Sequence, residues 1–213
     1  SRASVDVGSI AGLGDAAFAT LVEADVQVVV DRTMTWPASG AAIGYGAHAE
    51  RGILTRTATT WYLAEGSTAG NFDLFYLIQN PTETDATIEV TYLLPSGPPI
   101  VRTYQAEKQS RFNIWVDQQG PPLDDTDVSA VIRSTNGVPV IVERAMYLSA
   151  PGQLFAAGHE SAGVTAPANE WFLAEGATGP YFDLFILIAN PNAQDATIEA
   201  RYLLPSGQVI TKT

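Results

Sequence analysis

The sequence predicts an all-β protein that contains two tandem copies of one repeat. Residues 61–100 align without a gap with residues 171–210, and 26 of the 40 aligned positions are identical. Short runs in which apolar and polar residues alternate occur in both copies, and this pattern is typical of strands with one buried face. Clusters of Pro, Gly, Ser and Asn separate these runs. Together, the three observations predict a chain of β-sandwich repeats.

The individual strands follow from the alternation. Apolar side chains occupy every second position in residues 72–78, 88–94, 112–116 and 138–142. Turns are indicated at Asn80-Pro81, Pro95-Ser96-Gly97, Gly120-Pro121-Pro122 and Asn136-Gly137, the last of which is typical of a two-residue β-hairpin. Residues 14–23 are the only candidate for a short helix. About seven strands fit a period of roughly 110 residues, which predicts two tandem immunoglobulin-like β-sandwich repeats of about seven strands each.

The repeat can be divided at more than one point along the chain. One division places the first repeat in residues 1–107 and the second in residues 108–213, so that both cores close. The alternative makes residues 61–170 the complete unit, flanked by two half units, with residues 37–60 and 150–170 as linkers. Half units expose apolar surface and unpaired strand edges. We therefore expect the first division.

Composition and charge limit the partners of the chain. Its 213 residues include 23 acidic and 11 basic side chains, for a net charge of -12, and the basic residues are scattered. Nucleic acid and anionic membranes both require a basic surface, so we expect neither as a partner. No apolar run reaches the roughly 18 residues of a membrane span, so we expect no membrane insertion. The absence of Cys leaves the compartment open.

Four motifs carry a resemblance to a known type of repeat. They are W-[YF]-L-A-E-G, F-D-L-F-x-L-I-x-N-P, Y-L-L-P-S-G and V-I-V-E-R-A-M-Y. With these motifs the chain resembles the tandem immunoglobulin-like β-sandwich repeats of large bacterial secreted or surface-anchored proteins, and the resemblance covers essentially the whole chain. It implies an extracellular, cell-surface setting with many copies, no catalysis, and neighbouring repeats or homotypic copies as partners. The first copy departs from the pattern with Asp31 in place of Glu143 and Thr35-Trp36 in place of Tyr147-Leu148.

Arg32 and Arg144 are the most informative polar residues, because alternation places each on the same face of its strand as apolar neighbours. A guanidinium group in that position needs a carboxylate partner. Glu65 and Glu175, one in each copy of the W-[YF]-L-A-E-G motif, are the candidates. The first division predicts structural ion pairs of Arg32 with Glu65 and of Arg144 with Glu175, whereas the alternative pairs Arg144 with Glu65. An arginine at the rim that reaches water without a glutamate partner remains the other interpretation.

An acidic cluster formed by Asp124, Asp125 and Asp127 occurs in only one copy. Its carboxylates offer ligands for Ca²⁺, but solvated loop acids are the better interpretation of the cluster. No other cofactor or metal is indicated. His48 and His159 occupy matching positions in Gly-rich stretches, where we expect structural loop residues.

Trp36 and Trp115, which also occur in only one copy each, are candidates for contact with a ligand or a partner. An exposed indole stacks on a sugar ring or packs against a neighbouring repeat. The sequence contains no Cys nucleophile, G-x-S-x-G elbow or phosphate-binding loop, so we expect no enzyme. The expected function is a structural or adhesive module that acts as a stalk or spacer. A carbohydrate-binding module that uses exposed aromatic residues is the alternative, and a glycan hydrolase with paired carboxylates is a remote one.

Overall fold

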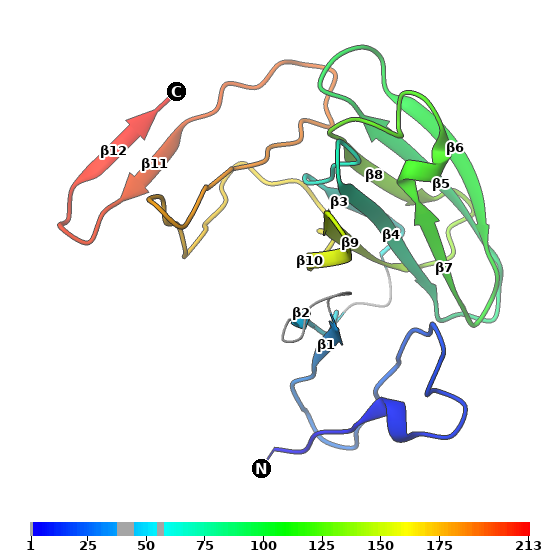
Figure 1. Ribbon diagram of the computed structural model, residues 1–213. Helices are drawn as coiled ribbons and strands as arrows, with labels where there is room; N and C mark the ends of the chain where they lie inside the picture. Colours follow the sequence, from blue (N-terminus) through cyan, green and yellow to red (C-terminus); the bar gives the residue numbers. More distant parts are fainter. Residues whose placement is uncertain (1, 38–44, 55–57) are drawn as a thin grey trace.

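Two four-stranded antiparallel sheets pack face to face in the middle of the chain (Figure 1). The computed structural model describes residues 2–37, 45–54 and 58–213. One sheet has the strand order β10-β9-β4-β7 and the other has the order β3-β8-β5-β6. The eight strands are β3 (Thr60–Leu63), β4 (Phe72–Asn80), β5 (Ala86–Leu93), β6 (Ile100–Ala106), β7 (Ser110–Trp115), β8 (Ser129–Ser134), β9 (Ile141–Ala150) and β10 (Gln153–Ala162). We refer to residues 58–164 as the central sandwich.

The remaining described residues form two flanks. The N-flank (residues 2–37 and 45–54) contains the 3-10 turn η1 (Val7–Ser9) and a hairpin of β1 (Asp31–Pro37) and β2 (Tyr45–Arg51). The C-flank (residues 165–213) ends in a hairpin of β11 (Ala200–Leu203) and β12 (Val209–Lys212). A second 3-10 turn, η2 (Val116–Gln119), lies in the central sandwich. The prediction of an all-β protein is therefore confirmed, and no helix in the described ranges is long and apolar enough to cross a membrane.

The core of the central sandwich follows from the alternation in the sequence. Leu74, Tyr76 and Ile78 in β4 are at most 1% exposed, while the residues between them are only half-buried. Every second residue of β5 from Ala86 to Tyr92 is likewise fully buried. Burial of one such large apolar side chain contributes about 1.5–3 kcal/mol. Trp61 joins the two sheets, because its indole N–H donates to the backbone oxygen of Val140 at 2.9 Å.

The Asn-Pro turns form in both copies. The side-chain amide of Asn80, which is 0% exposed, donates to the backbone oxygens of Thr84 at 2.8 Å and Ala106 at 3.0 Å. In the C-flank, the amide of Asn190 donates to the backbone oxygen of Gln194 at 2.7 Å. Because Asn190 makes this bond outside any closed core, the turn is determined by the local sequence.

Two local predictions were wrong. Gly137 does form a turn, with a φ of 76°, but the strands on either side of it, β8 and β9, belong to different sheets. The Asn136-Gly137 pair therefore crosses between sheets instead of closing a hairpin, and the Asn136 amide anchors it to the backbone oxygen of Asp85 at 2.8 Å. Residues 14–23 form no helix. They bury no apolar face, and a short helix is not stable without tertiary packing.

The strand order of the central sandwich is related to that of immunoglobulin domains but differs from it. In the constant-type immunoglobulin sandwich the second and fifth strands share one sheet and the third and sixth share the other. Here the corresponding pairs are β4 with β7 and β5 with β8. The first strand, β3, joins β8, and the seventh, β9, joins β4. The fourth, β6, pairs with β5. The first, fourth and seventh strands thus lie in the opposite sheets relative to that fold, while the β-sandwich itself is confirmed.

The expected domain boundary after Glu107 is wrong, since it falls between two strands of the same sandwich. β6 ends at Ala106 and β7 begins at Ser110 in the opposite sheet. Ile88 before the boundary and Ile114 after it belong to one buried cluster. The described residues thus contain one closed core instead of two, and its position agrees with the alternative division, in which residues 61–170 form the complete unit. Closure requires both halves of the repeat, and among the residues that the structure describes only this stretch has its two halves packed together.

Candidate inter-repeat contact site

The β1–β2 hairpin of the N-flank lies against the outer surface of the central sandwich, where β2 runs next to β10. In β9, Val142, Arg144 and Met146 face the core, so Glu143 and Tyr147 between them face outward. The hairpin covers these outward side chains. Because β1–β2 and β9–β10 are equivalent in the repeat, this is a contact between corresponding parts of two successive copies.

Arg32 is the centre of the polar half of this contact. Its guanidinium group donates to the carboxylate of Glu143 at 3.1 Å and lies 2.6 Å from an oxygen of Glu160. Burial alone would lower the pKa of Arg32, but the two carboxylates more than offset that effect and raise it. The arginine therefore stays charged and joins the hairpin to both β9 and β10.

His48 extends the same network under the hairpin. Its Nδ1 lies 3.0 Å from Glu160, and its Nε2 lies 3.3 Å from the hydroxyl of Tyr147. Burial lowers the pKa of His48, with Arg32 adding to the effect, and burial raises the pKa of Glu160 to about 7, with Glu143 adding to it. The side chains of His48 and Glu160 are only 3% and 2% exposed, so a substrate could not reach this acid–base pair. Its effect is to hold the two hairpins together.

Aromatic rings form the other half of the contact. Trp36 stacks with Tyr147 edge-on, at a centroid distance of 5.4 Å, and its indole N–H donates to the backbone oxygen of Phe155 at 2.6 Å. Tyr147 packs against Phe155 at 4.7 Å, and Phe75 lies between Tyr147 and Trp115 at 5.9 Å and 5.1 Å. Such ring pairs each contribute about 0.5–1.5 kcal/mol beyond their buried area.

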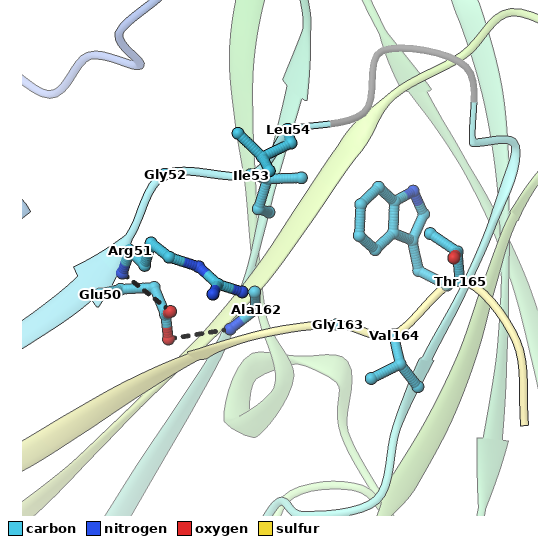
Figure 2. Close-up of a pocket in the computed structure, with 10 residues that line it drawn as sticks. Glu50, Arg51, Gly52, Ile53, Leu54, Ala162, Gly163, Val164 and Thr165 are labelled. Atoms are coloured by element: carbon cyan, nitrogen blue, oxygen red, sulfur yellow. Dashed lines mark hydrogen bonds between the residues drawn. The ribbon is translucent and has the colours of Figure 1, made fainter. Parts of the chain in front are cut away.

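The segments that enter and leave the central sandwich meet beside this contact. Val164 and Tyr62 exchange two backbone hydrogen bonds, of 2.8 Å and 3.0 Å. Residues 50–54 and 162–165, together with Trp61, line a shallow hollow there (Figure 2). The carboxylate of Glu50 accepts hydrogen bonds from the backbone N–H groups of Arg51 at 2.9 Å and Ala162 at 3.1 Å, and so connects the two segments (Figure 2).

The second arginine, Arg144, forms an ion pair inside the central sandwich. Its guanidinium group lies 2.9 Å from the carboxylate of Glu65 and 3.3 Å from Nδ1 of His159. Its side chain is 3% exposed, and burial lowers its pKa against the opposing effect of Glu65. The pair that the alternative division predicts is thus present.

The ion pairs expected from the first division are not formed. Arg32 binds Glu143 and Glu160 in place of Glu65. Arg144 uses Glu65, and Glu175 is exposed in the C-flank. The reason is the same as for the domain boundary: Glu65 lies in the sandwich that contains Arg144, and the sandwich equivalent to it is not closed around Arg32.

The other sequence candidates have structural partners. Within the described residues, which include the candidate calcium ligands Asp124, Asp125 and Asp127, no three His, Cys, Asp or Glu side chains form a group that could hold a metal ion. The carboxylate of Asp125 accepts from the backbone N–H of Gly70 at 3.3 Å. Trp36 and Trp115 are half-buried against neighbouring rings, and Trp36 packs on the next copy, in line with the interpretation of packing against a neighbouring repeat.

His48 and His159 were expected in loops but lie in strands β2 and β10. Both pack against a carboxylate, His48 at 3.0 Å from Glu160 and His159 at 3.5 Å from Glu65. Gly46 and Gly158 explain why these stretches are Gly-rich: a Cβ atom at either position would come within 2.6 Å of the rings of Trp36 or Tyr147.

Three residues of the contact, Glu143, Glu160 and Tyr147, were not candidates in the sequence. The only available signal was that the two copies differ there: Asp31 replaces Glu143, and Thr35 replaces Tyr147. Such differences are expected where two copies of a repeat occupy different sides of one contact.

No family model and no curated protein matches this chain. Several solved structures resemble parts of it, among them the following two. The crystal structure of Thermotoga maritima 1070 is 18% identical, with 53% of this chain and 97% of that chain covered and a TM-score of 0.47. The Anabaena sensory rhodopsin transducer is 25% identical, with 43% of this chain and 91% of that chain covered and a TM-score of 0.35.

Proposed function

We propose that the chain is a non-catalytic structural repeat module of an extracellular bacterial surface protein, in which it acts as a stalk or spacer. One observation carries the proposal: the polar residues shared by both copies build the fold. Asn80 closes a turn inside the sandwich, and its equivalent Asn190 closes the same turn in the C-flank. Arg144 and Glu65, whose equivalents are Arg32 and Glu175, form the ion pair of the core. Repetition has therefore preserved the architecture.

The contact between successive copies supports the same function. Arg32, His48 and Trp36 bring one copy against Glu160 and Tyr147 of the next, through buried charges and stacked rings. Within the single chain, a directional contact of this kind limits how the N-flank rotates against the central sandwich. The extracellular and cell-surface setting is supported by the resemblance to repeats of secreted bacterial proteins.

Stretching of single molecules of the full chain, held at its two ends, tests the mechanical role. The central sandwich should unfold in one discrete event. Because Tyr62 and Val164 are adjacent in the folded state, almost the whole length of the unfolded segment is released, which is about 350 Å at ~3.3–3.6 Å per residue. A force trace that rises without such an event would contradict a spacer function.

A glycan array tests the alternative of carbohydrate recognition. Trp115 lies on the outer face of β7 against Phe75 and is half-buried there, which makes it the residue to vary. We expect no glycan to bind. Binding that disappears in Trp115→Ala but persists in Trp171→Ala would replace the structural proposal with a recognition function.

A further inference from the structure

The C-flank exposes side chains whose equivalents form the core of the central sandwich. Trp171 is 60% exposed, whereas Trp61 is 1% exposed, and Leu173 is 70% exposed, whereas Leu63 is 4% exposed. The same holds further along the flank: Leu184, Ile188, Ile198 and Tyr202 are 39–56% exposed, and their equivalents Leu74, Ile78, Ile88 and Tyr92 are at most 1% exposed. So much exposed apolar surface on one segment marks an interaction surface.

The N-flank exposes the complementary set. Val28, Val30 and Met34 are 54%, 37% and 42% exposed. Their equivalents in and just before β9, Val140, Val142 and Met146, are at most 6% exposed. This flank therefore also has a face that is suited to the inside of a sandwich.

The two flanks correspond to the two halves of one sandwich. Residues 170–213 of the C-flank are equivalent to residues 60–103, which include β3, β4, β5 and most of β6, and the N-flank is equivalent to the stretch from β7 to β10. In the central sandwich these halves pack against each other throughout the core. Two of the polar connections between these halves have equivalents in the flanks: Trp61 with Val140 becomes Trp171 with Val28, and Arg144 with Glu65 becomes Arg32 with Glu175.

We propose that the C-flank of one chain and the N-flank of a second copy close into a sandwich like the central one, so that copies join through a shared β-sandwich. The partner half comes from a second copy because the two flanks of one chain lie on different sides of its central sandwich (Figure 1). The inference deepens the proposed function and rests on it, since it names the segments through which structural modules join.

Association replaces one set of ion pairs with another. In the single chain, the face of β1 that carries Arg32 and Met34 is turned toward Glu143 and Glu160. In the shared sandwich that face turns inward, and Arg32 leaves these two carboxylates for Glu175 of the second copy. The exchange keeps the guanidinium paired and buries the exposed valines, so the net gain comes from apolar burial.

Engineered cysteines give the sharpest test, because the chain has none of its own. Leu77 and Glu143 are directly opposite each other in the β4–β9 ladder, on the outward face. Their equivalents are Leu187 in the C-flank and Asp31 in the N-flank. Residues opposite each other in an antiparallel pair have Cα atoms about 4.5–5.5 Å apart, which is within the range of a disulfide.

One copy with Asp31→Cys is mixed with one copy with Leu187→Cys under mild oxidation. We expect a disulfide-linked heterodimer. Glu199→Cys replaces Leu187→Cys in the control, because its equivalent Glu89 lies in β5, opposite β6 and β8, so it should not link to Asp31→Cys. A link that forms equally in the control, or none with Leu187→Cys, overturns the proposal.

Sedimentation of the unmodified chain over a range of concentrations supplies the second measurement. We expect the mass to rise with concentration beyond that of one chain. Glu175→Ala should weaken association about tenfold or more, whereas Glu170→Ala, whose equivalent Thr60 takes no part in the ion pair, should leave it unchanged. The proposal is overturned if the chain sediments as a monomer at every concentration. It is also overturned if a chain that carries both Asp31→Cys and Leu187→Cys stays monomeric because the disulfide forms within it. The stretching experiment on the central sandwich would be unaffected by that result, so the two failures are distinguishable.

Discussion

The ion pair between Arg144 and Glu65 yields a prediction about which of its two charges the core depends on. The side chain of Arg144 is 3% exposed, while that of Glu65 is 30% exposed. Removal of Glu65 leaves a buried guanidinium group without a carboxylate. Removal of Arg144 leaves a carboxylate that still reaches water. We therefore expect Glu65→Ala to destabilise the central sandwich more than Arg144→Met does.

The magnitudes follow from the burial of each partner. An uncompensated buried charge costs about 3–5 kcal/mol, so Glu65→Ala should lower the free energy of unfolding by about that amount. Arg144→Met keeps most of the side-chain volume and strands only a partly solvated carboxylate, so about 1–3 kcal/mol is expected. The double variant has neither charge and should be more stable than Glu65→Ala alone.

Urea unfolding followed by circular dichroism measures these differences, with Glu89→Ala as a control for the loss of a glutamate from an exposed ion pair. The slope of the unfolding free energy against urea should be unchanged in all variants. The reasoning is refuted if Arg144→Met is more destabilising than Glu65→Ala, or if the double variant is less stable than Glu65→Ala. Either result would mean that the contribution of Arg144 to stability comes mainly from its packing and not from its charge.

Three further predictions concern the contact site, the repeated turn and the acidic loop. Burial raises the pKa of Glu160 to about 7 from an ordinary 4.5. The stabilisation that this shift gives to hairpin docking is therefore full below about pH 4.5 and is lost as the pH rises through 7. Hydrogen exchange in β2 should show this pH dependence, and Glu160→Gln should abolish it. Equal pH profiles of the two proteins would contradict it. Asn80→Ala should cost about 1–3 kcal/mol of unfolding free energy, since it removes the hydrogen bonds of a fully buried amide to the backbone oxygens of Thr84 and Ala106, while Asn190→Ala should cost the central sandwich nothing. Calcium should not change the thermal midpoint, because the acids at 124–127 do not converge, and a rise of several degrees would restore the calcium hypothesis.

The strands of the sandwich could be predicted from the sequence because one of their faces is buried. The alternation in residues 72–78 and 88–94 gave β4 and β5 with the correct inward face. The division of the repeat could not be predicted in the same way, since each stretch has the same local pattern whether or not its partner half is packed against it. We favoured the division that closes two cores, and the chain closes one.

The contact site was predictable only in part. The need of each arginine for a carboxylate was correctly inferred, and Glu65 was correctly among the candidates for Arg144. Glu143 and Glu160 as partners of Arg32 were not predicted, because that contact joins residues more than 100 positions apart on different copies, and no periodicity links them. Alternation shows which face of a strand is buried, and gives no information on which segment covers it.

Arg32 and Arg144 occupy the same position in the repeat but pair with different carboxylates. Arg144 is satisfied inside a closed sandwich, whereas Arg32 is satisfied on the outside of a neighbouring one. A strand whose inward face carries a charge can therefore bind the acidic outer surface of a neighbouring sandwich before its own partner half packs against it. A purely apolar strand could not form such ion pairs, and its exposed surface would promote aggregation. Arg32→Leu should keep the apolar face of the N-flank that fits its partner half, but should lose the ion pairs with Glu143 and Glu160. That variant should form more large aggregates at low concentration than the unmodified chain, as measured by light scattering, and equal scattering from the two proteins would show that the charge of Arg32 has no protective effect.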